Sequence, residues 1–237
     1  MTNKEKQVRN SLFYILPNIS NAILLAFVSI VILYVGGAKL THILASSFGC
    51  LLAAGTGAML FAHSRERIFT FFHSLNSGGN INLQVKQALL GLGSGGIFGV
   101  GIGHGQQSNL FLPEAYGDFI FAVMGEELGF IGSVVIVLSF LALFIVGIVI
   151  AKKTKDRFGQ LLAFGISFSI VLYAFINIAV SAGLLPTTGL PLPFISYGGT
   201  SMTFLCISIG ILINIALSNS VDRKSNIEVI SNSNERL

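Results

Sequence analysis

Residues 112–132 read LPEAYGDFIFAVMGEELGFIG and open an apolar run that continues to residue 151. A membrane-spanning helix needs roughly 20 apolar residues, and this run is longer. Four carboxylates stand at its mouth, those of Glu114, Asp118, Glu126 and Glu127, in a chain that is otherwise short of charge. The stretch therefore predicts a membrane helix with chemically active acids at one edge of the bilayer.

The composition of the whole chain also indicates an integral membrane protein. Of 237 residues, 53% are hydrophobic and 10% are charged, and the mean hydropathy is +0.80. Such a chain has too few polar side chains to cover a soluble globule. The net charge is +4, but Lys and Arg stand in short clusters between apolar runs, so we expect no nucleic-acid partner. Cys50 and Cys206 lie inside apolar runs and show no metal-ligand spacing.

Six apolar runs predict an all-α, polytopic membrane fold with about six transmembrane helices. We expect one transmembrane domain over residues 1–218 and a disordered cytoplasmic tail over residues 219–237. The weakest run is rich in glycine at the spacing that lets helix backbones approach closely, so it is expected to insert against neighbouring helices. The approximate helices are 11–36, 40–62, 84–103, 119–151, 158–182 and 194–217.

The basic residues predict the orientation of these helices, because Lys and Arg concentrate in cytoplasmic loops. With six spans, four basic clusters fall on one side, which places both termini in the cytoplasm and the loops 104–117 and 183–193 outside. Only Lys39 lies on the opposite side. The clusters are Lys4 with Lys6 and Arg9, Arg65 with Arg67, Lys152 with Lys153, Lys155 and Arg157, and Arg223 with Lys224.

The second outer loop, residues 183–201, reads GLLPTTGLPLPFISYGGTS. Its three prolines prevent the preceding helix from continuing, and Gly198 with Gly199 lets the chain re-enter the membrane closely. Either the loop is a stiff re-entrant turn without chemistry, or it lines a site for a polar headgroup. In the second case Ser196 and Tyr197 are candidate substrate contacts.

The acids at the mouth of residues 119–151 are the main candidates for chemistry. If the chain is helical from Asp118, Glu126 lies about 80° around the helix from it, so the two can share a cavity, while Glu127 points away. Acids at a membrane edge are usually functional, although an acid there also stabilises a helix N-terminus. Asp118 is favoured for function, and Glu114, Glu126 and Glu127 are open between the two roles.

Three motifs, which follow one another along the chain in the order that the family has, resemble the shape, elongation, division and sporulation (SEDS) family. This family comprises the FtsW, RodA and SpoVE proteins. The motifs are residues 112–132, residues 183–201 and the upstream LGSGGIFGVGIG of residues 92–103. The segment PNISNA at residues 17–22 also resembles the PDxGTA segment of that family, with Asn18 and Asn21 replacing its aspartate and threonine. The resemblance covers nearly the whole chain.

The resemblance implies a fold like the C-terminal part of a ten-helix SEDS protein, in an N-terminally short member. It implies a peptidoglycan glycosyltransferase that polymerises lipid II at the outer face of the bacterial cytoplasmic membrane, in division, elongation or sporulation. The implied partners are lipid II, membrane lipids and a class B penicillin-binding protein. The family's catalytic base maps to Asp118, and its LPE glutamate maps to Glu114.

Glycosyl transfer from a diphosphate-linked lipid needs a base and a group that stabilises the leaving diphosphate. Asp118 can be the base, but residues 87–151 contain neither Lys nor Arg. Backbone amides, helix N-termini or a divalent cation held by Glu114 and Asp118 are the alternatives. Ser108 or its neighbours stand where division-type members often carry lysine, and we expect Ser108 and His104 to be minor substrate contacts.

Three classes of function follow from these observations. An enzyme requires Asp118 for polymerisation of lipid II. A flippase for the lipid-linked precursor depends on the shape of its cavity more than on one carboxylate. A catalytically inactive, truncated SEDS paralogue acts as a scaffold and tolerates loss of Asp118.

Overall fold

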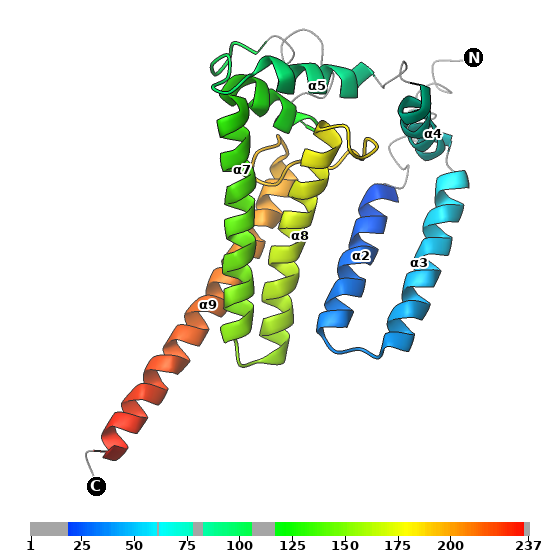
Figure 1. The fold of residues 1–237 in the computed structure, drawn as a ribbon. Helices are drawn as coiled ribbons and strands as arrows, with labels where there is room; N and C mark the ends of the chain where they lie inside the picture. The colour runs from blue at the N-terminus through cyan, green and yellow to red at the C-terminus, as the bar shows by residue number, and fades with distance from the viewer. Residues whose placement is uncertain (1–18, 61, 78–82, 106–116, 235–237) are drawn as a thin grey trace, which may run out of the picture.

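The computed structural model describes residues 19–60, 62–77, 83–105 and 117–234. These residues form helices joined by turns and contain no strand, which confirms the all-α fold class (Figure 1). The helices are α2 Ile19–Val35, α3 Leu40–Leu60, α4 Ala62–Ser77, α5 Leu83–Ser94, α7 Ile120–Lys153, α8 Arg157–Ser181 and α9 Gly199–Asn234.

Within the described residues, four segments are long and apolar enough to cross a membrane. They are Leu40–Gly57, Ile120–Lys153, Arg157–Ser181 and Gly199–Asn219. Helix α2 is apolar, with 17 residues in the described part of the chain, and it lies lengthwise beside α3 (Figure 1). These helices are the expected architecture of a multi-pass membrane protein.

The span predicted over residues 84–103 is not formed. Helix α5 has 12 residues, ends at Ser94 and lies across one end of the bundle (Figure 1). The following residues form turns in which Gly96, Gly99, Gly101 and Gly103 all have positive φ. Hydropathy does not register this backbone conformation, which ends the helix long before it is long enough to cross the bilayer.

Glycines in these turns allow a close contact with a break in α7. Gly129 has φ 70° and ψ −168°, so α7 bends there into a short first part and a long second part. The backbone amides of Val100 and Phe130 donate to Glu126 O at 3.0 Å and Gly96 O at 2.9 Å. A Cβ on Gly99 would collide with Glu127 O, and one on Gly129 would collide with Gly99 N. The glycines therefore allow a close approach between these turns and the break in α7, in place of the predicted approach of two helices.

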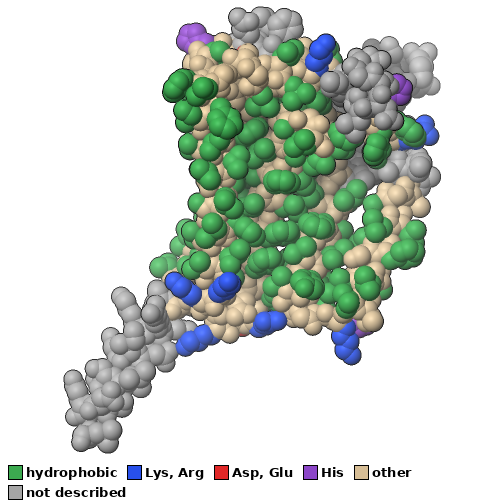
Figure 2. Space-filling model, in the orientation of Figure 1, with side chains coloured by type: hydrophobic (Ala, Val, Ile, Leu, Met, Phe, Trp, Pro, Cys, Tyr) green, Lys and Arg blue, Asp and Glu red, His purple; other side chains and the backbone are tan. Residues whose placement is uncertain are grey.

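Two side chains show which loops share an end of the bundle. Arg157 Nη2 donates to Gly36 O at 3.1 Å, which joins the α2–α3 turn to the start of α8. Arg67 Nη1 donates to Thr187 O at 3.2 Å, which joins α4 to the loop after α8. We call the end of the bundle at which Arg157 lies the basic end, because exposed cations gather there (Figure 2). The end at which Arg67 lies is called the Asp118 end. The exposed cations of the basic end are Lys39, Lys152, Lys153, Lys155 and Arg157.

This arrangement differs from the predicted topology in the ends of the bundle at which the basic residues and the two termini lie. Since residues 84–103 do not span, Arg65 and Arg67 lie at the Asp118 end and Lys39 lies with the other cations. The start of α2 and the end of α9 are at opposite ends of the bundle, whereas both termini were predicted on one side (Figure 1). The backbone of α9 also continues to Asn234, through most of the tail predicted to be disordered.

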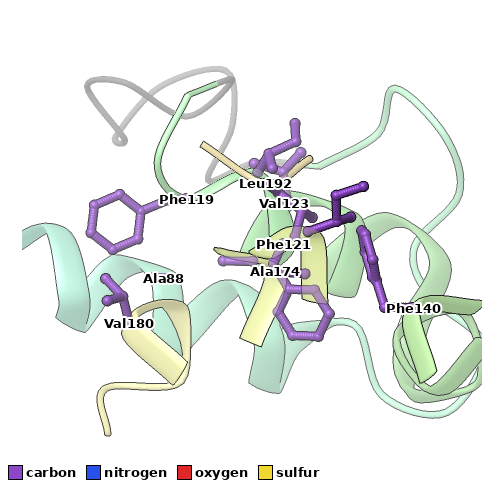
Figure 3. Close-up of a cluster of buried hydrophobic side chains, with 11 residues drawn as sticks. Ala88, Phe119, Phe121, Val123, Phe140, Ala174, Val180 and Leu192 are labelled. Atoms are coloured by element: carbon purple, nitrogen blue, oxygen red, sulfur yellow. The ribbon is translucent and has the colours of Figure 1, made fainter. Parts of the chain in front are cut away.

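A cluster of buried hydrophobic side chains lies at the Asp118 end, where α5, α7, α8 and the loop after α8 meet. Leu190 and Leu192 of that loop are each 1% exposed, so the loop turns back into the bundle as a re-entrant segment. Phe119 lies beside Ala88 and Val180, and Phe119 and Phe121 belong with Leu192 to one buried cluster (Figure 3). This cluster fixes the start of α7, and it includes Ala88, Phe119, Phe121, Val123, Phe140, Ala174, Val180 and Leu192.

Candidate functional site

Asp118 lies just before α7, where the re-entrant loop and α8 meet it. Its side chain is partly buried, and its backbone oxygen accepts a hydrogen bond of 2.8 Å from Asn177 Nδ2. The same nitrogen donates to Leu190 O at 2.7 Å. Asn177 is 1% exposed in the middle of an otherwise apolar stretch of α8. One buried amide therefore holds the backbone of Asp118 against the re-entrant loop.

Ser196 holds the backbone of Gly117, the residue before Asp118. Its hydroxyl donates to Gly117 O at 2.7 Å and accepts from the amide of Leu192 at 2.8 Å. Its only O–H is therefore directed at the backbone. The substrate contact predicted for Ser196 stays a prediction. The predicted contact Tyr197 is 92% exposed next to it.

The structure brings Arg67 to the same place from α4. Gly189 has φ +74°, and a Cβ built on it would lie 3.7 Å from Asp118 Oδ2 and 3.8 Å from Arg67 Nη1. The carboxylate oxygen and the guanidinium nitrogen thus lie no further apart than the sum of those distances. Arg67 is not among the predicted site residues, because the predicted six-span topology places it on the other side of the membrane. Arg67 lies in a polar segment between two apolar runs, and this is the feature of the sequence that could have pointed to it.

Glu126 and Glu127 belong to the contact between α7 and the glycine-rich turns. Glu126 is 2% exposed, and its backbone oxygen accepts from Val100 N. Glu127 is partly buried, and its backbone oxygen accepts from the amide of Gly101 at 3.1 Å. A function of either side chain toward substrate stays a prediction.

The remaining predicted site residues are less informative. His104 is exposed, and its Nδ1 lies 3.2 Å from Ile102 O within its own turn. Glu114 and Ser108 lie outside the described residues, so the proposed cation site of Glu114 and Asp118 is not tested. Among the described residues, no three His, Cys, Asp or Glu side chains converge as metal ligands would.

An apolar cavity of about 730 Å³ lies between α2, α8 and α9. Pro191 and Pro193 of the re-entrant loop form part of its wall, and these two residues flank Leu192, whose amide bonds Ser196. The cavity therefore borders the segment that holds Gly117. Its other walls include Val28, Ile32, Leu161, Ile170 and Phe204.

Curated proteins of known sequence are similar to most of this chain. A probable peptidoglycan glycosyltransferase FtsW of Geobacter sp. (strain M18) is 43% identical over 197 residues, which cover 82% of this chain and 53% of that protein. Stage V sporulation protein E of Bacillus subtilis (strain 168) is 38% identical over 202 residues, with 84% and 55% covered. The chain thus spans about half the length of the curated relatives it matches.

A solved structure shares the fold. It comes from work on the structural coordination of polymerization and crosslinking by a peptidoglycan synthase complex. The TM-score is 0.63 at 23% sequence identity, over 84% of this chain and 55% of the solved chain. The family model for FtsW, RodA and SpoVE, described as "Cell cycle protein", matches residues 8–221. With nearly the whole chain matched, the protein belongs to the FtsW/RodA/SpoVE family.

Proposed function

We propose that the protein is a peptidoglycan glycosyltransferase that polymerises lipid II, with Asp118 as its general base. The observation that carries the proposal is the position of Asp118 at the edge of the bundle, with its backbone bonded to Asn177 and that of Gly117 bonded to Ser196. A base must be held close to the hydroxyl whose proton it accepts, and these bonds fix the backbone from which the Asp118 side chain extends. The names of the curated relatives support the same activity.

The reaction assigns the following steps to the site. The Asp118 carboxylate takes the proton of the acceptor sugar's hydroxyl, and that oxygen forms a bond to the anomeric carbon of the donor. The bond from this carbon to the lipid-linked diphosphate breaks, and its electron pair leaves with the diphosphate. The apolar cavity beside Pro191 and Pro193 is suited to the hydrocarbon tail of such a lipid.

The proposed orientation follows from the cations of the basic end. Lys and Arg are enriched on the cytoplasmic side, so Lys39 and Lys152 face the cytoplasm and Asp118 faces the outer surface of the cytoplasmic membrane. This is the side on which the polymer is needed. A class B penicillin-binding protein is the proposed partner, supported by the family resemblance and by the synthase complex that shares the fold.

Polymerisation of lipid II by the purified chain, together with a candidate class B penicillin-binding protein, tests the proposal. The variant is Asp118→Asn, and the matched control is Asp156→Asn at the basic end. Asp156 caps α8 by accepting from Gly159 N at 2.8 Å, and asparagine caps a helix equally well.

Loss of a general base lowers the rate by about 100-fold to 10,000-fold. We expect that loss in Asp118→Asn and an unchanged rate in Asp156→Asn. Equal rates in the two variants would remove Asp118 from the mechanism. Absence of polymer from the wild-type chain with its partner, when it is folded and inserted, would contradict the proposed activity and favour a scaffold.

A further inference from the structure

A glycosyl transfer at Asp118 has an electrostatic difficulty that the sequence alone leaves open. The leaving diphosphate gains negative charge as its bond to the sugar breaks, and it does so near a carboxylate. A cation or a set of fixed donors must offset that charge. Residues 87–151, which include the start of α7, supply no Lys or Arg.

The structure supplies a cation from elsewhere in the chain. Arg67 is partly buried on α4, and its Nη1 donates to Thr187 O at 3.2 Å. The same nitrogen and Asp118 Oδ2 both lie within 4 Å of the position that a Cβ on Gly189 would occupy. We propose that Arg67 binds the diphosphate of the lipid-linked substrate and of the lipid product. This inference rests on the proposed function and assigns the recognition of the leaving group at that site.

The chemistry of arginine fits this task. A guanidinium is planar, always charged and carries five N–H donors, which match two oxygens of a phosphate at once. One donor of Arg67 is directed at Thr187 O, and this bond orients the group toward the re-entrant loop. A guanidinium has four further N–H donors, which are enough for a bidentate contact with phosphate.

The glycine close to both groups is consistent with a site that must admit a ligand. Gly189 combines a left-handed backbone with the absence of a side chain, at a point where a Cβ would lie within 4 Å of both the carboxylate and the guanidinium. The acceptor hydroxyl meets Asp118 and the diphosphate meets Arg67, so the sugar that is transferred lies between them. The proton moves to Asp118, the electron pair moves to the diphosphate, and Arg67 keeps its charge throughout.

Binding measurements separate this role from a structural one. The probes are a polyprenyl diphosphate and the matching polyprenyl monophosphate, each titrated onto the purified full chain in lipid nanodiscs. Arg67→Gln removes the charge but keeps an N–H donor for Thr187 O. Arg67→Lys keeps the charge, and Arg65→Gln is the matched control, because Arg65 is exposed on the same helix.

We expect Arg67→Gln to weaken binding of the diphosphate about tenfold or more and to weaken binding of the monophosphate by a smaller factor, because the monophosphate carries less charge and fewer acceptor oxygens. Arg67→Lys should restore part of the affinity, and Arg65→Gln should bind both lipids as the wild type does. Wild-type affinity of Arg67→Gln for the diphosphate would overturn the proposal. An equal loss for both lipids, with a lowered unfolding temperature, would also overturn it, because that result describes a support for the loop.

The same assay keeps this inference separate from the proposed function, since binding requires no turnover. Asp118→Asn should retain its affinity for the polyprenyl diphosphate while it loses polymerisation. Normal diphosphate binding by Arg67→Gln, together with inactivity of Asp118→Asn, would refute the role of Arg67 alone. Diphosphate binding that depends on Arg67, with an active Asp118→Asn, would refute the role of the base alone.

Discussion

Asn177 donates a hydrogen bond of 2.8 Å to the backbone oxygen of Asp118, 59 residues away in the sequence. The same amide nitrogen donates to Leu190 O, so one side chain of α8 connects the start of α7 to the re-entrant loop. In an apolar environment these carbonyls have few alternative donors. The position of the proposed base therefore depends on a residue that does not belong to its own motif.

Replacing Asn177 with alanine should damage both stability and activity. The carbonyls of Asp118 and Leu190 would lose their common donor, and a buried acceptor without a partner costs about 1–3 kcal/mol. We expect a lower thermal unfolding temperature in detergent and a polymerisation rate lowered between about tenfold and 100-fold, because the base is displaced. Ser181→Ala is the matched control on the same helix. Ser181 is fully buried, and no residue in the described part of the chain bonds its hydroxyl, so its removal should change neither quantity. A fully active Asn177→Ala would show that the bond to Asp118 is dispensable.

Ser196→Ala and Tyr197→Ala should differ in their effect on kcat, although both residues were predicted to be substrate contacts. Ser196 bonds Gly117 O and Leu192 N, so its loss should lower kcat several-fold and leave KM for lipid II nearly unchanged. Tyr197 is exposed, and its removal should leave kcat unchanged. Steady-state polymerisation at varied lipid II concentration checks both values. A rise in KM confined to Ser196→Ala would favour the predicted role in substrate binding.

The contact between the glycine-rich turns and the break in α7 predicts a pair of contrasting alanine variants. In Gly99→Ala the new Cβ would collide with Glu127 O, and φ +80° at this position disfavours alanine as well. We expect a loss of about 2 kcal/mol in the free energy of unfolding. Gly93 lies in α5 with open space around it, so Gly93→Ala should stabilise by about 0.5–1 kcal/mol. Denaturation in mixed micelles measures both, and equal effects of the two substitutions would contradict the tight contact.

The parts of the fold that the sequence predicted well are those that the bilayer itself dictates. Helices α7 and α8 begin and end within two residues of the predicted runs, because the length of an apolar run directly reflects the thickness to be crossed. The predicted span 84–103 failed because glycines with positive φ end a helix without lowering its hydropathy. That one error reversed the side assigned to Arg65 and Arg67.

The candidate site was predictable only where its residues carry their own signal. Asp118 stands out as an acid at the mouth of an apolar helix. Asn177 and Arg67 act at the site through contacts across 59 and 120 residues of sequence, with Asp118 and Thr187 respectively. No periodicity within a single helix reports such a contact. A lone amide inside an apolar helix is nevertheless a useful sign, because a polar side chain there usually bonds another segment.

The side of the membrane on which Arg65 lies provides the sharpest test of the fold. In a background with Cys50→Ser and Cys206→Ser, Arg65→Cys and Lys155→Cys introduce one thiol each at exposed positions of the two ends. A membrane-impermeant thiol reagent applied to intact spheroplasts should label Arg65→Cys and reach Lys155→Cys only after permeabilisation. Six spans would instead place both thiols inside. Arg67 lies two residues from the labelled position and on the same helix. Protection of Arg65→Cys in intact spheroplasts would therefore separate Arg67 from any substrate at the outer surface, and the assignment of the diphosphate contact would fail with it.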